Sequence, residues 1–361
     1  MEQITDAMGM LDLMAHPAFC VKDGIIVKVN PGAAGLLIET GTRAADLLLT
    51  GEEEYEDFSD GCLYLNLSVS NQSMGASVTR MAGFDVFCLE QSADNAELQA
   101  MALAARELRE PLASVMITAD RLFPISGLED DPATREQVAR INRGLFQMLR
   151  VIGNMSDASR YTADTPNRQE LRDICAVLNE AFSKAASLVE HTGITLRYQG
   201  YPEPIYSLAD SEKLERAVFN IISNAIKFTP SGGTIDASLT CRGRKLYLSI
   251  CDSGCGIAKN LRGNVFSRYT RQPSVEDGRF GIGLGMVLIR AAAALHGGAV
   301  LIDQPAGAGT RITMSLAIRQ DTRGQIRSPM LLMDYAGERD HGLIEFSETL
   351  PAKLYDPENI S

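Results

Sequence analysis

Tryptophan is absent from this 361-residue chain, and aromatic residues make up only 6% of it. Its hydrophobic cores must therefore rely on Leu, Ile, Val, Met and Ala. No segment approaches the ~18 consecutive apolar residues of a membrane-spanning helix; the apolar run at 286–295, for example, is interrupted by Arg290. The first residues, MEQITDAMGM, lack the basic-then-apolar pattern of a signal peptide. We therefore expect a cytoplasmic protein without a membrane span.

Positive charge is also scarce, because 46 acidic residues outnumber 34 Lys and Arg and give a net charge of −12. This balance argues against nucleic acid or an anionic membrane as the main partner. The seven cysteines form no dense, evenly spaced framework, which indicates free thiols in a reducing compartment. Cys251 and Cys255 lack the second ligand pair that a zinc site needs.

The length predicts several domains, and the first spans residues 8–92. Asp23-Gly24 separates two β-rich runs, which is a strong hairpin signal. Apolar and polar residues alternate over 63–69, as in a strand with one buried face, and 83–89 predicts another strand. The order of helix, hairpin, short helices and later strands resembles a PAS sensor domain, in which Asn30 would close the second strand. A small dimerisation cap without a sensing role is the alternative.

Residues 94–163 predict a helical hairpin. Apolar residues recur at alternating steps of three and four in both halves, and the segment between them contains Pro and Gly. The two seams are Leu98, Met101, Ala105, Leu108, Leu112, Val115, Ala119 and Leu122, then Val138, Ile141, Leu145, Met148, Ile152 and Met155. Two such helices cannot bury both seams alone, so the pattern favours a dimeric four-helix bundle. An intramolecular coiled-coil spacer is the alternative.

Residues 165–318 contain two glycine clusters, at 254–256 and 281–285, on either side of a polar segment. Such clusters allow the backbone to approach a phosphate-bearing ligand closely. A predicted helix at 211–228 carries Asn220 and Asn224 one turn apart on an otherwise mostly apolar sequence. Two buried amides without partners would be costly, so we expect them to have a partner. The pattern predicts a nucleotide site.

Five motifs in order resemble the ATP-binding domain of sensor histidine kinases, and more loosely the wider ATPase superfamily with type II topoisomerases. They are Asn224-Ala-Ile-Lys-Phe-Thr-Pro, Asp252-x-Gly-x-Gly, Val265-Phe-Ser-Arg-Tyr-Thr-Arg, Gly281-x-Gly-Leu-Gly and Gly307-Ala-Gly-Thr-Arg. The resemblance covers most of residues 95–318. The implied fold is multidomain α+β: a PAS-like module, a helical hairpin that dimerises, and a two-layer α/β sandwich that binds ATP, followed by an extension at 319–361.

The resemblance implies a role for each matching residue. Asn224 would coordinate a Mg²⁺ ion that bridges the phosphates of ATP, and Asn220 would support it. Lys227 would neutralise phosphate charge, while Phe228 would pack near the adenine. Asp252 would accept a hydrogen bond from the adenine amino group. The other implied ATP contacts are Thr310 beside the base, Gly254, Gly256, Gly281, Gly283, Leu284 and Gly285 along the backbone, and Phe266, Tyr269 and Arg271 in a lid. Taken singly, these residues have plainer readings, such as a turn aspartate, a packing glycine or a core phenylalanine.

One expected feature is missing. Members of this family phosphorylate a histidine within a sequence close to Ser-His-Glu-Leu-Arg-Thr-Pro-Leu, and this chain has Ala-Arg-Glu-Leu-Arg-Glu-Pro-Leu at 105–112. Glu107 matches, but Arg106 occupies the acceptor position, and a protonated guanidinium has no lone pair to attack phosphorus. Glu110 replaces the threonine that the resemblance links to phosphatase activity. Both customary reactions of the hairpin are therefore in doubt.

Three functional hypotheses remain open. The first is a regulatory pseudokinase of a two-component system that binds ATP and Mg²⁺ and acts through homodimerisation, heterodimerisation with another histidine kinase, or a response regulator. The second is an active histidine kinase that uses another acceptor or a partner in trans. The third is a nucleotide-gated switch or slow ATPase. The extension at 319–361 is either a packed addition to the ATP domain or a docking tail.

Overall fold

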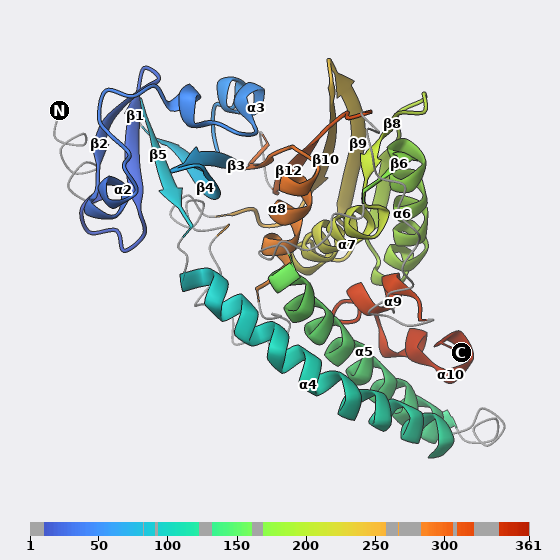
Figure 1. The fold of residues 1–361 in the computed structure, drawn as a ribbon. Helices are drawn as coiled ribbons and strands as arrows, with labels where there is room; N and C mark the ends of the chain where they lie inside the picture. The colour runs from blue at the N-terminus through green and yellow to red at the C-terminus, as the bar shows by residue number, and fades with distance from the viewer. Residues whose placement is uncertain are drawn as a thin grey trace.

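The computed structural model of the chain describes residues 11–81, 83–90, 93–122, 132–160, 169–257, 266, 283–305, 309–320 and 339–360. An N-terminal sheet module and an α/β domain lie side by side, and a long helical hairpin extends away from both (Figure 1). The C-terminal helices lie beside the hairpin, next to the α/β domain. None of the described helices has the length and apolarity to cross a lipid bilayer.

The N-terminal module is an antiparallel sheet in the order β2-β1-β5-β4-β3. Its elements are β1 (Ala18–Lys22), β2 (Ile25–Val29), α2 (Pro31–Gly35), η1 (Ala44–Leu47), α3 (Glu52–Asp57), β3 (Cys62–Val69), β4 (Gln72–Met81) and β5 (Phe84–Leu89). The predicted hairpin is confirmed, since Asp23 and Gly24 both adopt positive φ between β1 and β2. Asn30 follows β2, and its Oδ1 accepts hydrogen bonds from the amides of Ala18 and Ala33.

This sheet does not end at the module. Strand β3 pairs antiparallel with β11 (Val300–Asp303) of the α/β domain, so that Cys62, Leu63 and Tyr64 face Ile302, Leu301 and Val300 in turn. The pairing joins both sheets into one of ten strands. Gly61 permits the contact, because a Cβ at this position would lie 2.1 Å from the carbonyl oxygen of Ile302.

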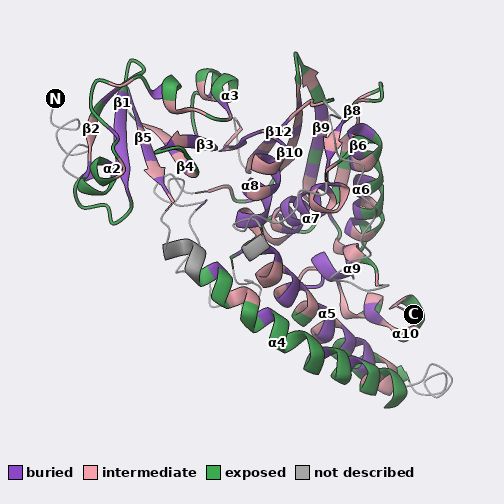
Figure 2. Ribbon diagram, viewed as in Figure 1, coloured by how far each residue is buried: buried purple, intermediate pink, exposed green. Residues whose placement is uncertain are grey.

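Helices α4 (Ala93–Leu122) and α5 (Pro132–Arg160) form the predicted antiparallel hairpin (Figure 1). Only part of each predicted seam is buried within one chain. The buried members are Leu98, Ala105, Leu112, Val138, Leu145 and Ile152. Leu108, Val115, Leu122, Ile141 and Met148 remain between 44% and 67% exposed. Figure 2 shows the resulting exposed side of α4.

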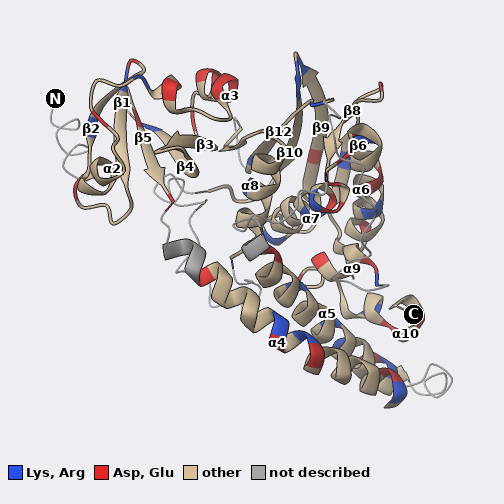
Figure 3. Ribbon diagram, in the orientation of Figure 1, with Lys and Arg blue, Asp and Glu red and all other residues tan. Residues whose placement is uncertain are grey.

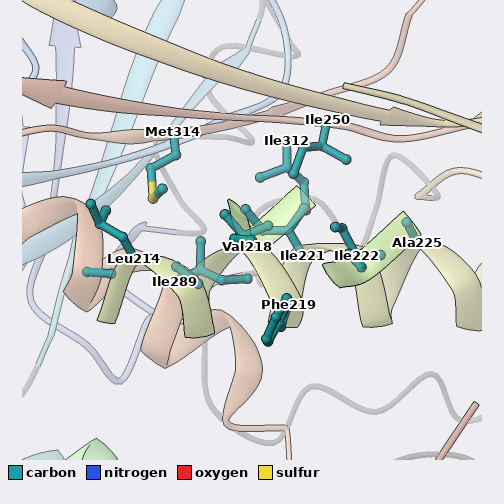
Figure 4. Packing of buried hydrophobic residues seen from close by; sticks show 14 of the residues in the cluster. Leu214, Val218, Phe219, Ile221, Ile222, Ala225, Ile250, Ile289, Ile312 and Met314 are labelled. Carbon is teal, nitrogen blue, oxygen red and sulfur yellow. The ribbon is translucent and has the colours of Figure 1, made fainter. Parts of the chain in front are cut away.

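In the α/β domain, helices α6 (Ile174–Val189), α7 (Ser211–Phe228) and α8 (Gly285–Leu295) pack against a sheet in the order β11-β12-β10-β9-β7. The remaining strands are β6 (Glu170–Asp173), β7 (Thr195–Gln199), β8 (Tyr206–Ala209), β9 (Thr234–Arg242), β10 (Lys245–Asp252) and β12 (Arg311–Ala317). Every second residue of β10 is buried, which gives the sheet its apolar face. Figure 4 shows Val218 and Ile221 of α7 beside Ile250, Ile312 and Met314.

The described part of the C-terminal extension, residues 339–360, is packed into the protein. It forms α9 (His341–Glu345), η5 (Ala352–Tyr355) and α10 (Pro357–Ile360), which contact α5, α6 and α7. The ring of Phe346 packs against Phe219 of α7, with centroids 5.3 Å apart. That of Tyr355 packs against Phe146 of α5 at the same centroid distance. The sequence left open a packed addition or a docking tail, and residues 339–360 form a packed addition.

His296 connects the end of α8 to the start of α7. Its Nδ1 lies 2.7 Å from the carbonyl oxygen of Ala292, and the amide of Asp210 donates to its Nε2 at 3.1 Å. The ring is therefore neutral with the proton on Nδ1. Burial lowers the pKa of His296 to about 4, so the folded protein resists protonation of this ring.

We expect this buried histidine to make folding pH-dependent. Because its folded pKa lies below the ordinary value of about 6.5, its contribution is present above pH 6.5 and is lost as the pH falls toward 4. Between pH 7 and pH 5 the free energy of unfolding should fall by about 2 kcal/mol more in the wild type than in His296→Gln. Urea titrations at both pH values measure this. His191→Gln, at an exposed site, should keep the wild-type difference, and equal slopes in all three proteins would contradict the assignment.

Candidate nucleotide site

Helix α7 presents the two predicted asparagines from a helix whose apolar side fills the core. The helix starts at the cap residue Asp210, whose Oδ1 accepts from the amide of Lys213. Asn220 is 1% exposed and donates through Nδ2 to the carbonyl oxygen of Arg216. Its Oδ1 has no hydrogen-bond partner among the residues that the structure describes. Asn224 follows one turn later, and its Nδ2 lies 3.9 Å from the sulfur of Met286.

The glycine motif before α8 faces these amides. A Cβ at Gly285 would lie 3.1 Å from Asn220 Oδ1 and 3.8 Å from Asn224 Nδ2, so glycine lets the start of α8 approach α7 closely. Gly283 adopts φ +79°, a conformation that favours glycine. The amide groups at a helix start suit an anion. The structure thus brings Gly285, at the start of α8, close to the two asparagines.

Asp252 lies at the end of β10 and is 8% exposed. Its Oδ1 accepts hydrogen bonds from the amides of Gly254 (2.8 Å) and Thr310 (3.2 Å). Burial raises the pKa of the carboxyl group, and these two donors oppose the shift. Gly309 allows the close approach of β12, because a Cβ there would lie 1.9 Å from the carbonyl oxygen of Asp252. The arrangement fixes Oδ1 with two backbone donors.

The first glycine cluster belongs to the same turn. A Cβ at Gly254 would lie 2.4 Å from the carbonyl oxygen of Phe228, which ends α7. Gly256 has φ +72°, and a Cβ there would lie 2.8 Å from the side chain of Gln304. The Phe228 side chain itself is 37% exposed. These glycines therefore permit close packing between the end of α7 and the turn after β10.

The donor set suits a magnesium–phosphate group. Asn220 Oδ1 is a buried carbonyl oxygen without a described partner, and Asn224 adds a second amide beside the start of α8. Amide oxygens are hard ligands of the kind that Mg²⁺ accepts, and Mg²⁺ in phosphate sites is commonly held by one or two protein oxygens together with the phosphates. The residues present therefore fit the group that the sequence predicts.

Lys227 lies near this site but has a partner within the protein. Its ammonium group forms an ion pair with Glu348 of the C-terminal extension. Burial lowers the pKa of Lys227, as does the nearby charge of Arg150. The sequence did not indicate this contact, because residues beyond 318 match no motif of the family.

The predicted lid is only partly described. Phe266 is 1% exposed, and its ring lies 5.4 Å from that of Tyr64 on β3 of the N-terminal module. Its carbonyl oxygen accepts a hydrogen bond from Arg290 of α8. The structure thus places Phe266 where the two halves of the ten-stranded sheet meet. Tyr269, Arg271 and Gly281 lie outside the described residues.

The hairpin positions lie on a different surface. Arg106, Glu107 and Glu110 are exposed on α4. The start of α4 nevertheless reaches the glycine motif, because Leu98 packs with Leu284, and α8 continues this contact. Leu284 is therefore a buried contact between the hairpin and the α/β domain, a role that its motif did not reveal.

Comparisons with known proteins show which proteins the chain is similar to. Residues 209–320 match the family model of histidine kinase-, DNA gyrase B- and HSP90-like ATPases. The sensor-like histidine kinase R01002 of Rhizobium meliloti (strain 1021) is 30% identical over 283 residues, 72% of this chain and 52% of the relative. Histidine protein kinase DivJ of Caulobacter vibrioides is 31% identical over 245 residues, 63% of this chain and 40% of the relative.

A solved structure shares the fold. The crystal structure of full-length ShkA in complex with AMPPNP covers 62% of this chain and 46% of that chain, with a TM-score of 0.50 and 21% identity. The chain therefore carries a histidine kinase-type ATPase domain, and its homologues support a relation to the sensor histidine kinases. It spans about half or less of the length of the two relatives named above.

Asp252→Asn tests the base-binding role. The asparagine keeps an Oδ1 acceptor for Gly254 and Thr310 but replaces the second carboxylate oxygen with a donor. ATP affinity should fall at least tenfold, since a hydrogen bond to a charged group contributes ~1.5–3 kcal/mol. Because the pKa of Asp252 is raised by burial, ionisation at neutral pH opposes folding, and the variant should melt no lower than the wild type.

Isothermal titration with ATP and Mg²⁺, together with thermal melting, checks both parts. Asp236→Asn, on an exposed position of β9, is the matched control and should bind like the wild type. Unchanged ATP affinity in Asp252→Asn would contradict the proposed contact with the base.

Proposed function

We propose that this protein is a histidine kinase-like regulator that binds ATP with Mg²⁺ and does not phosphorylate itself on the hairpin. The observation that carries the proposal is the site at Asn220, Gly285 and Asp252, in which a buried amide oxygen lacks a described partner and a buried carboxylate is held by two amides. The AMPPNP bound by ShkA supports an adenine nucleotide as the ligand.

In this proposal, Asn224 and Asn220 hold the magnesium ion and Lys227 attracts the phosphates. The bound metal would supply charge neutralisation for the phosphate oxygens. Asp252 orients the base, with Thr310 beside it, while the backbone at Gly283 and Gly285 faces the phosphates. Phe266, Tyr269, Arg271 and Gly281 would belong to the lid.

The lack of an acceptor makes the protein a pseudokinase in this proposal. Arg106 occupies the acceptor position on an exposed face of α4, and the segment 94–163 contains no histidine. The four histidines of the chain are His16, His191, His296 and His341. Of these, His296 is buried and neutral in its structural role. Regulation would then act through partners: a second kinase-like chain or a response regulator that docks near Arg106, Glu107 and Glu110.

The N-terminal module would serve as the PAS-like sensor, and the order of hairpin, short helices and later strands within residues 18–89 supports this role. Scattered cysteines favour a reducing compartment such as the cytoplasm for this signalling role. For this protein we propose the domain limits 8–92, 94–163, 165–318 and 319–361.

Dimerisation through the hairpin has a direct test. Val115 is 52% exposed on the apolar stripe that continues through Leu108 and Leu122. Val115→Glu should convert a dimer into monomers, because a carboxylate would have to be buried without a partner in the bundle. Light scattering coupled to size-exclusion chromatography measures the mass.

Ala113→Glu is the matched control for this substitution. Ala113 is exposed and lies two residues away, about 160° around the helix, so the variant should remain dimeric. A wild type that stays monomeric at high concentration, or a dimeric Val115→Glu protein, would contradict the four-helix bundle.

The missing acceptor is tested by restoring it. The wild type incubated with γ-labelled ATP should acquire no acid-labile label, whereas Arg106→His should acquire it, since neutral imidazole supplies the nucleophilic lone pair. Arg109→His, on the same helix, should stay unlabelled. Acid-labile label on the wild type would overturn the pseudokinase proposal and favour an active kinase with another acceptor. Failure to capture any receiver domain in pulldowns would favour a nucleotide-gated switch.

A further inference from the structure

A row of polar residues on α7 faces the hairpin and the C-terminal extension. Arg216, Asn220, Ser223 and Lys227 follow one another at steps of three or four, so they share one side of the helix. Two of these residues, Asn220 and Lys227, belong to the candidate nucleotide site. The same row of polar residues therefore lines the candidate nucleotide site and contacts α5.

The hydrogen-bond and ion-pair partners of this row come from α5 and the C-terminal extension. Arg150 of α5 donates to Ser223 Oγ at 3.1 Å and to Glu345 of α9 at 3.2 Å. Arg216 donates to the other oxygen of Glu345, also at 3.2 Å. Both arginines and Glu345 are at most 5% exposed. The buried carboxylate therefore joins α5, α7 and the extension.

Glu348 extends the network to the nucleotide site. One of its oxygens lies 2.9 Å from Arg150 and also pairs with Lys227. The Glu348 side chain is 14% exposed and that of Lys227 10%. A phosphate group and the Glu348 carboxylate are both anions, and both would use the same ammonium group.

The geometry points to Glu348 as an intramolecular competitor of nucleotide phosphate at Lys227. This inference rests on the proposed ATP site. When a nucleotide phosphate binds Lys227, Glu348 retains its ion pair with Arg150 but loses its ion pair with Lys227 of α7. Nucleotide occupancy therefore changes how the extension and α5 are held against the ATPase domain. Because binding linkage is reciprocal, contacts that favour the docked Glu348 weaken nucleotide binding by the same factor.

The rest of the extension limits the movement to the region of Glu348. Ile344, Phe346, Leu350 and Tyr355 are all fully buried. Tyr355 also donates through its hydroxyl group to the carbonyl oxygen of Leu343 at 2.7 Å. These contacts anchor the segment on both sides of Glu348, so the competition requires only a local movement at 347–350 in which Glu348 leaves Lys227.

The test compares ATP binding by full-length variants in the presence of Mg²⁺. Glu348→Gln retains the size of the side chain but removes its charge, so the Kd for ATP should fall about tenfold, as expected when one charge-assisted hydrogen bond no longer competes. Glu358→Gln is the matched control, because Glu358 lies in the same extension and pairs with Arg135 away from Lys227. Its Kd should equal that of the wild type.

Hydrogen exchange provides an independent measurement on the wild type. Saturating ATP and Mg²⁺ should speed exchange of the amides at 347–350, where Ser347, Thr349 and Leu350 donate to nearby carbonyl groups. Equal Kd values for wild type and Glu348→Gln, with no change in exchange, would overturn the competition while leaving the ATP site intact. If neither protein binds ATP, the proposed nucleotide site itself is wrong, and the inference falls with it.

Discussion

The arrangement of the hairpin, the ATPase domain and the C-terminal extension depends on the buried carboxylate of Glu345. A buried charge is tolerated only when it is paired and hydrogen-bonded, and here Arg150 and Arg216 meet this need from two different helices. Arg216 also pairs with Asp157 of α5. Because no single element could satisfy these charges, α5, α7 and α9 must be in place together. Figure 3 shows charged residues along both helices of the hairpin.

Main-chain pairing gives the N-terminal module a similarly defined place. The β3–β11 contact is short, but side chains reinforce it on both sides: Lys245 pairs with Glu54 at 2.7 Å, and Arg290 pairs with Glu90 and lies 4.9 Å from the ring centroid of Tyr64. Tyr64 also meets Phe266 of the predicted lid. The N-terminal module therefore has a direct connection to the α/β domain.

The candidate site keeps the motifs of the family that the chain resembles, whereas the hairpin departs from them. Around Asn220, Gly285 and Asp252 the residues fit a nucleotide in type and position, and tight backbone approaches explain the glycines. On α4 the backbone around Pro111 remains helical, but Arg106 stands at the position that the resemblance assigns to the phosphoacceptor histidine. The features needed to bind ATP and those needed to accept its phosphate are separable, since they lie on different elements with different local constraints.

The sequence by itself determined the elements whose information is local. The Asp23-Gly24 turn and the span of α7 follow from backbone preferences and periodicity, and these two predictions are confirmed. The sequence also indicated the apolar seams of the hairpin helices. It did not indicate which residues of each seam are buried within one chain. Only the tertiary structure decided the partners of Lys227, Leu284 and Phe266, because these contacts join segments far apart in the chain. Glu345 and Glu348 carry no local pattern that distinguishes them from solvent-exposed acids, and only the three-dimensional meeting of α5, α7 and α9 gives them their role.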